Sequence, residues 1–379
     1  MINHPRQLLN AGRRASLALA LVAGCTPPTT ATAPNSAERD VATQLGACFD
    51  AQTAVFPFNG IVHAERGPWT FTRTAGALAP SEAAQPRADT PYSLASVSKV
   101  FTNVAIGQLV DQGRVSLDAP IGTYLPDLPP AFAAITLDQL IHHRSGVASF
   151  LQPAPEWFEA VQRARTARDL VPLVTRAPLA FRPGEREEYS NGGYVLAGAV
   201  VEAVTGKPFA DHLEEAIFRP LGMTRTSLDP IAGTAMPMTR LSPPGAPPSE
   251  ELRPVPMNIA FRATPAGSAR STAEDLTRFG RALLGEALLR PETRARLFRR
   301  RGEPWRIGGA GGNIGTNTDF AVLPELGWVV VVLSNYDPPS AETMARVLHG
   351  VLAGRGCRTV SEADAPSPFG PPAGQRRRN

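Results

Sequence analysis

Segments with strand character lie near both ends of this 379-residue chain, and segments with helical patterns lie between them. Residues 58–77 have β character on both sides of a Gly-Pro turn. Near the other end, Thr318–Val322 and Trp328–Leu333 flank a second turn, and the four consecutive valines Val329–Val332 are typical of a strand buried on both faces. We therefore expect an α/β (α+β) fold with one sheet built from both ends of the chain and a helical insertion at about residues 97–260.

The charge balance argues against a nucleic-acid partner. The formal net charge is +4, but three arginines lie in the first 24 residues and three more at positions 376–378. The rest of the chain is close to neutral and offers no basic footprint for a phosphate backbone. The basic residues are almost all arginine, and the two lysines are Lys99 and Lys207. Because a lysine can lose its proton and an arginine cannot, Lys99 merits attention, whereas we interpret Lys207 as a remaining lysine of a chain biased towards arginine.

The N-terminus has the pattern of an export signal. Basic residues precede a short apolar run, Ala15–Ala23, which is too short to span a bilayer. Residues 1–24 are therefore predicted to be a signal peptide. The sequence Val-Ala-Gly before Cys25 resembles the lipobox of bacterial lipoproteins, which implies acylation of Cys25 and a lipid anchor, in the outer membrane facing the periplasm where the host has two membranes. Ordinary cleavage beside an unmodified cysteine is the alternative. Residues 25–45, rich in Pro, Thr and Ala, are predicted to be a flexible tether.

Export would place the two other cysteines, Cys48 and Cys357, in an oxidising compartment. They lie near opposite ends of the predicted hydrolase domain, residues 46–357. Sequence leaves two possibilities open, a disulfide between them or two buried free thiols, because it does not determine the separation of their Cα atoms. The Pro-, Gly- and Arg-rich residues 358–379 are predicted to be disordered.

The sequence Ser96-Val97-Ser98-Lys99 forms an S-x-x-K motif at the start of a predicted helix. Three residues along a helix return to the same face, so the amine of Lys99 can reach the hydroxyl of Ser96 and activate it as a nucleophile. The free N–H groups of a helix N-terminus also favour developing negative charge. This pattern predicts nucleophilic catalysis by Ser96.

A second motif, Tyr189-Ser190-Asn191, precedes two glycines. A tyrosine beside a lysine can accept a proton because the ammonium favours its phenolate. An asparagine can bind a substrate amide through both its donor and its acceptor. We therefore interpret Tyr189 as a proton-transfer group and Asn191 as a substrate contact.

Taken together, the ordered segments of residues 58–352 are similar to the serine β-lactamase family in its broad sense, which includes class C β-lactamases, related esterases and D-aminopeptidases. This resemblance implies an antiparallel sheet flanked by helices, acylation of Ser96, proton transfer by Lys99 and Tyr189, and release of the acyl group by water. It implies no metal and no cofactor, and we expect a monomer. The segments that carry it are Tyr92–Lys99, Leu109–Gly113, Ile135–Leu140, His143–Gly146, Tyr189–Asn191, Thr205–Phe209, Arg219–Met223 and Ser271–Leu276.

The third motif of that family departs from the pattern. Gly309 lies where the family has the Lys or His that helps to hold a substrate carboxylate. Gly311 and Gly312 remain as substrate-binding positions, and the N–H of Gly312 can join that of Ser96 in an oxyanion hole. Arg306 is a nearby candidate for the missing cation.

This departure favours an esterase or amidase that acts on a small uncharged acyl substrate. A β-lactamase or D-Ala-D-Ala-type peptidase, and a non-catalytic binding or sensor lipoprotein, are the alternatives. The adjacent His142 and His143 point to opposite sides and have no accompanying carboxylate cluster, so we assign them a structural or surface role rather than metal binding.

Overall fold

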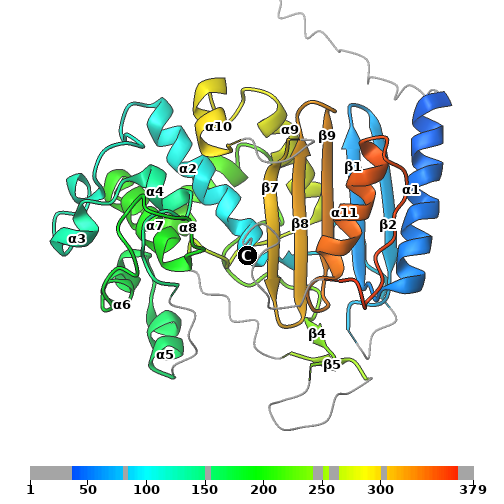
Figure 1. The fold of residues 1–379 in the computed structure, drawn as a ribbon, viewed down its shortest axis with the longest axis horizontal. Helices are drawn as coiled ribbons and strands as arrows, with labels where there is room; N and C mark the ends of the chain where they lie inside the picture. The colour runs from blue at the N-terminus through cyan, green and yellow to red at the C-terminus, as the bar shows by residue number, and fades with distance from the viewer. Residues whose placement is uncertain are drawn as a thin grey trace, which may run out of the picture. The chain divides into compact units, whose positions relative to one another are not determined.

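A five-stranded antiparallel sheet joins the two ends of the chain (Figure 1). The strand order is β2-β1-β9-β8-β7, so strands from the two ends meet where β1 pairs with β9, with Val62 opposite Val332. The prediction of one sheet built from both ends is confirmed. The strands are β1 (Gly60–Arg66), β2 (Trp69–Ala75), β7 (Ile307–Asn313), β8 (Thr316–Leu323) and β9 (Trp328–Ser334).

The computed structural model describes residues 36–79, 84–149, 155–241, 251–255, 264–299 and 305–365. All of them belong to one compact unit, Pro34–Asn379. The predicted signal peptide and Cys25 lie outside the described residues. Among the described residues, no helix combines the length and the apolar character needed to cross a membrane.

Helices cover both faces of the sheet (Figure 1). The helices α1 (Ser36–Val55) and α11 (Ser340–Leu352) lie on one face, where Met344 packs with Val330 and Val332. The helix α9 (Ala273–Leu284) lies on the other face, against Val329 and Val331. All four valines are therefore buried on alternate faces, as expected for a central strand.

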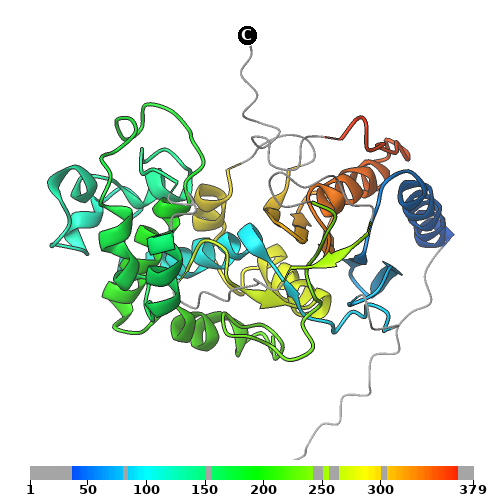
Figure 2. The same cartoon turned by 90° about the horizontal axis from the view of Figure 1, so that it is seen from below.

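Most of the remaining helices gather beyond β7 (Figures 1 and 2). The two longest of these helices, α2 and α7, pack against each other. Its helices are α2 (Lys99–Asp111), α3 (Pro130–Ala133), α4 (Leu137–Ile141), α5 (Pro155–Arg163), α6 (Val171–Val174), α7 (Asn191–Thr205), α8 (Phe209–Leu213) and α10 (Pro291–Leu297). Two short strand pairs complete the fold, β3 (Tyr92–Ser93) with β6 (Arg270–Ser271) and β4 (Met238–Thr239) with β5 (Arg253–Pro254).

The predicted boundaries need three corrections. Residues 36–45 belong to α1 and not to a tether, because Leu45 packs in the core between α1, α11 and the sheet. Within the segment predicted to be disordered, residues 358–365 are described by the structure, and the Gln52 side chain exchanges two hydrogen bonds with the backbone of Val360. The helical insertion predicted to end at about residue 260 is followed by two more helices, α9 and α10, before β7. Of these two, α9 packs on the sheet.

Cys48 of α1 and Cys357 are joined by a disulfide, with their Cα atoms 5.6 Å apart. This selects one of the two possibilities that the sequence left open. The bond connects α1 to the segment after α11, on the side of the sheet away from α9.

Candidate active site

Ser96 lies in a short 3₁₀ turn, Ala95–Ser98, immediately before α2. The turn is strained, since Ala95 has φ = +44°, which is rare for a residue other than glycine. Two hydrogen bonds stabilise it: the Ser98 hydroxyl donates to the carbonyl of Ala95 at 2.7 Å and accepts from the backbone N–H of Ala269 at 3.0 Å. Ser98 therefore stabilises the turn, whereas the hydroxyl of Ser96 makes neither of these two bonds.

The side chain of Lys99 is buried, and its Nζ contacts three oxygens. It lies 3.0 Å from Ser96 Oγ, 2.8 Å from Asn191 Oδ1 and 2.5 Å from the carbonyl oxygen of Ala266. The last two atoms only accept hydrogen bonds, so a neutral amine donates its two hydrogens to them and directs its lone pair at Ser96. Burial lowers the pKa of Lys99, and the nearby Tyr189 partly opposes this effect. The geometry suits a general base.

Tyr189 completes the group, with its hydroxyl 2.6 Å from Ser96 Oγ. The local sequence explains its placement: Ser190 caps α7 by accepting a hydrogen bond from Gly193 N–H at 2.9 Å, so Tyr189 precedes the helix and Asn191 begins it. The structure adds a contact of Asn191 that the sequence did not indicate, since its Oδ1 accepts a hydrogen bond from Lys99 Nζ, and the contact with substrate stays a prediction.

His143 is a site residue that the sequence interpretation missed. Its Nδ1 accepts a hydrogen bond from the backbone N–H of Ser190 at 3.2 Å, and its ring lies 4.6 Å from the ring of Tyr189. The backbone of His143 has φ = +57°, an unusual conformation that occurs at functional sites. His142 points elsewhere, with Nδ1 2.9 Å from the carbonyl oxygen of Asp138. No signal within the His-His pair itself indicated the contact with Tyr189, which lies 46 residues away.

The strand β7 forms the opposite wall of the site. A Cβ atom at Gly311 would lie 2.2 Å from the carbonyl oxygen of Leu94 and 2.8 Å from the backbone nitrogen of Ser96, so only glycine allows this close approach. By contrast, a Cβ atom at Gly309 would meet nothing within 4 Å. Gly309 therefore leaves open space where the family has a cation.

Arg306 does not replace that cation. Its Nη2 lies 3.0 Å from Oδ2 of the buried Asp319. Side chains alternate along β8, and Thr318 reaches Leu94 beside the site while Ala321 packs on the α11 face. Asp319 therefore lies on the α11 face, and the ion pair holds Arg306 on the far side of the sheet from Ser96.

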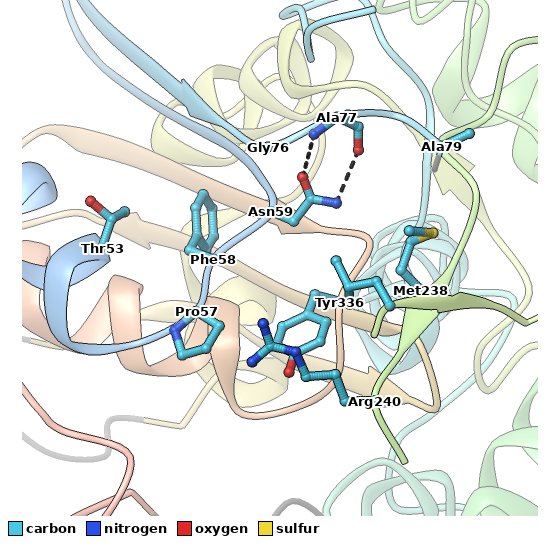
Figure 3. Close-up of a pocket in the computed structure, with 11 residues that line it drawn as sticks. Thr53, Pro57, Phe58, Asn59, Gly76, Ala77, Ala79, Met238, Arg240 and Tyr336 are labelled. Carbon is cyan, nitrogen blue, oxygen red and sulfur yellow. Dashed lines mark hydrogen bonds between the residues drawn. The ribbon is translucent and has the colours of Figure 1, made fainter. Parts of the chain in front are cut away.

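A separate cavity of about 510 Å³ lies near the start of β1 and the end of β9 (Figure 3). It includes none of the residues around Ser96. Its polar side chains already have protein partners: Asn59 exchanges hydrogen bonds with the backbone of Ala77 at 2.6 and 2.9 Å, and the guanidinium of Arg240 lies 5.8 Å from the ring centroid of Tyr336. Within the described part of the chain, no group of three or more His, Cys, Asp or Glu is placed to hold a metal ion.

Comparison with known proteins places this geometry in context. Residues 60–353 match the family model described as Beta-lactamase. The esterase EstB of Burkholderia gladioli is 34% identical over 199 residues, which cover 48% of this chain and 50% of the esterase. Penicillin-binding protein 4* of Bacillus subtilis is 30% identical over 175 residues, 45% of this chain and 38% of that protein. The matches thus span half or less of the length of these two curated relatives.

A solved structure extends the likeness over most of the chain. The D-stereospecific amidohydrolase from Streptomyces sp. superposes with a TM-score of 0.67 at 25% sequence identity, covering 85% of this chain and 99% of the amidohydrolase chain. The shared architecture is the mixed helix and antiparallel-sheet fold described above.

Proposed function

Since the chain belongs to the beta-lactamase family, we propose that it is an exported esterase or amidase that acts through an acyl-enzyme on Ser96. One observation carries the proposal: Ser96 Oγ lies within hydrogen-bond distance of both Lys99 Nζ, at 3.0 Å, and the Tyr189 hydroxyl, at 2.6 Å. A nucleophile in contact with a buried amine and a phenol has the partners that acyl transfer requires.

In the proposed acylation, Ser96 Oγ attacks the carbonyl carbon of an ester or amide and its proton passes to the neutral Lys99. The oxyanion that forms is bound by the backbone N–H groups of Ser96 and Gly312. Tyr189 donates its proton to the leaving oxygen or nitrogen as the bond to the acyl carbon breaks, and Lys99, which interacts with the phenol, returns the proton to Tyr189. Water then attacks the Ser96 ester and loses a proton to the same pair. The pair passes this proton to Ser96 Oγ as its bond to the acyl carbon breaks, and the carboxylic acid is released.

The substrate proposed here is a small acyl compound that needs no carboxylate for recognition. The support is the open space at Gly309 and the ion pair that keeps Arg306 on the other face of the sheet. The similarity to an esterase and to a D-stereospecific amidohydrolase agrees with an ester or amide bond as the target.

We also propose that residues 1–24 direct export and that Cys25 carries the lipid anchor, with the hydrolase acting as a monomer at the periplasmic side of the outer membrane. Mass spectrometry of the protein isolated from membranes tests the anchor. An acylated N-terminal Cys25 is expected, whereas an unmodified soluble product would contradict it.

The test of the hydrolase uses a fluorophosphonate probe, a panel of p-nitrophenyl esters and p-nitroanilides, and nitrocefin. Wild-type protein and a control variant of an exposed serine, Ser116→Ala, should react at Ser96, and Ser96→Ala should not. An unlabelled wild type, or equal turnover by Ser96→Ala, would overturn the proposal. Preferential turnover of nitrocefin would favour the β-lactamase alternative, and a burst followed by very slow release would favour a binding or sensor role.

A further inference from the structure

Asn317 of β8 is completely buried, and every hydrogen-bonding position of its amide is occupied. Its Nδ2 donates to the carbonyl of Gly311 at 2.9 Å and to Glu342 Oε1 at 3.1 Å. Its Oδ1 accepts from the backbone N–H groups of Ala341 at 2.7 Å and Glu342 at 3.0 Å. A flipped amide would bring donors against donors and acceptors against acceptors, so these contacts specify one orientation.

The contact with Gly311 determines the direction of the next N–H group. The carbonyl of Gly311 and the N–H of Gly312 belong to the same peptide group, in which a trans bond makes them point in opposite directions. Asn317 holds the carbonyl towards β8. The N–H of Gly312 therefore points away from β8, to the free edge of the sheet, because β7 is its outermost strand.

The turn that carries Ser96 packs against β7 at Gly311. A Cβ atom at Gly311 would be only 2.8 Å from the backbone nitrogen of Ser96, so the two backbone segments are in direct contact. The next side chain of β8, Thr318, donates to the carbonyl of Leu94 at 2.8 Å, just before the turn that carries Ser96. Two neighbouring residues of β8 thus bind the two backbone segments of the proposed oxyanion hole: Asn317 binds Gly311 from the α11 face of the sheet, and Thr318 binds Leu94 from the α9 face.

We propose that Asn317 is a positioning residue for the oxyanion hole and that Glu342 and the first turn of α11 clamp its amide. This inference rests on the proposed acyl transfer at Ser96. Asn317 touches no substrate; it acts by aiming the Gly312 N–H. Glu342 supplies the acceptor that keeps Nδ2 in place, and the two first-turn N–H groups of α11 hold Oδ1.

The sharpest variant is Asn317→Asp, because it keeps the shape and the acceptor for α11 but turns the donor into an oxygen that faces the carbonyl of Gly311. We expect kcat for a p-nitrophenyl ester to fall about 10- to 100-fold with KM changed less than about twofold, since a misdirected oxyanion donor acts on the transition state. The inhibition constant of phenylboronic acid, whose adduct with Ser96 mimics the tetrahedral oxyanion, should rise by a similar factor.

Two further variants separate the causes. Glu342→Gln keeps an oxygen acceptor for Asn317 and should retain kcat within about threefold. In the double variant Asn317→Asp with Glu342→Gln, the repulsion between two carboxylates is removed but the bond to Gly311 is still lost. A low kcat in the double variant assigns the effect to Gly311.

Asn335→Asp is the matched structural control. Asn335 is also buried, at 2% exposure, and its Nδ2 donates to the carbonyls of Ala77, Leu78 and Met236, none of which belongs to β7. This variant should lower the melting temperature without changing boronate affinity per folded molecule. Provided that the wild type reacts with the fluorophosphonate, two results would overturn this inference and leave the proposed function intact. One is a similar loss of boronate affinity in both Asp variants, and the other is a normal boronate affinity in Asn317→Asp. A wild type that neither reacts with the fluorophosphonate nor binds the boronate would overturn both this inference and the proposed function.

Discussion

The hydroxyl of Tyr189 lies 2.6 Å from Ser96 Oγ although 93 residues separate the two in the chain. The turn before α2 presents Ser96, and the segment before α7 presents Tyr189. Lys99 lies beside both, since its Nζ is 3.0 Å from Ser96 Oγ and 4.8 Å from the ring centroid of Tyr189. These contacts allow proton transfer among Ser96, Lys99 and Tyr189.

The pH dependence of kcat/KM should reveal Lys99 as the base. The neutral amine accepts the proton, so kcat/KM should rise with pH, with an apparent pKa below the ordinary lysine value because burial lowers the pKa of Lys99. Lys99→Arg keeps the positive charge but cannot lose a proton, and we expect a loss of about 100-fold or more and no rising limb. Steady-state rates with a p-nitrophenyl ester, measured across the pH range for wild type and for Lys99→Arg, give the pH profile and the loss of activity. A wild-type-like profile in Lys99→Arg would assign the base to another group.

Replacing Gly309 should create the missing cation. Gly309→Lys places an ammonium in open space, because a Cβ atom at this position meets nothing within 4 Å. A charge-assisted contact contributes about 1.5–3 kcal/mol, so kcat/KM for a substrate that carries a carboxylate should rise about 10- to 100-fold. Neutral esters should be turned over at the unchanged rate. Gly309→Met is the control of similar length, and an equal gain in that variant would show that charge is not the cause.

Two alanine substitutions in β7 should behave differently. Gly311→Ala places a Cβ atom 2.2 Å from the carbonyl oxygen of Leu94, so β7 must move away from Ser96 and kcat should fall at least about tenfold. Gly309→Ala is the matched control in the same strand and should keep its activity. Rates normalised to the folded fraction, taken from circular dichroism, distinguish the two variants. Equal activity would contradict the close approach of β7 to Ser96.

The disulfide between Cys48 and Cys357 should stabilise the fold without affecting the chemistry. Replacing both cysteines with alanine should lower the free energy of unfolding by about 2–5 kcal/mol, because the bond restricts the unfolded chain. The bond lies with α1 and α11, on the face of the sheet opposite α9, so activity per folded molecule should persist. Urea unfolding measures the change. Alkylation of both thiols without prior reduction would show that the bond is absent.

Burial of His63 should make the protein sensitive to acid. Burial lowers the pKa of His63 from 6.5 to about 4, and Arg281 adds to the effect. Between these two values the unfolded chain binds a proton that the folded chain does not, so stability falls as the pH drops through this window, by up to about 3 kcal/mol. His63→Gln removes this contribution and should lose less stability than wild type between pH 7 and pH 4 in urea unfolding. An identical loss in both proteins would contradict it.

Much of the fold follows from local sequence patterns. The four valines from Val329 to Val332 predict a strand covered on both faces, and the structure buries them on alternate sides in β9. Side-chain period and turn residues operate over a few positions, so they can be read without knowing the neighbours. The motif spacing likewise brings Ser96 and Lys99 together, because both lie within one helical turn.

The boundaries of the fold were harder to predict. Residues 36–45 resemble a tether by composition, yet they belong to α1 because Leu45 packs against a helix nearly 300 residues away in the chain. Burial against a distant partner stabilises a helix that its own composition does not indicate.

The sequence by itself predicted Ser96 as the nucleophile and Lys99 as its partner, and it determined that position 309 carries no cation. Only the tertiary structure decided which groups surround them. It placed His143 against Tyr189, bound Asn191 to Lys99 and paired Arg306 with Asp319 on the far face of the sheet. Each of these outcomes is a hydrogen bond, ring contact or ion pair between separate segments. Such contacts depend on distances to within a few tenths of an ångström and on the directions of the groups involved. Both are established only when the chain is packed.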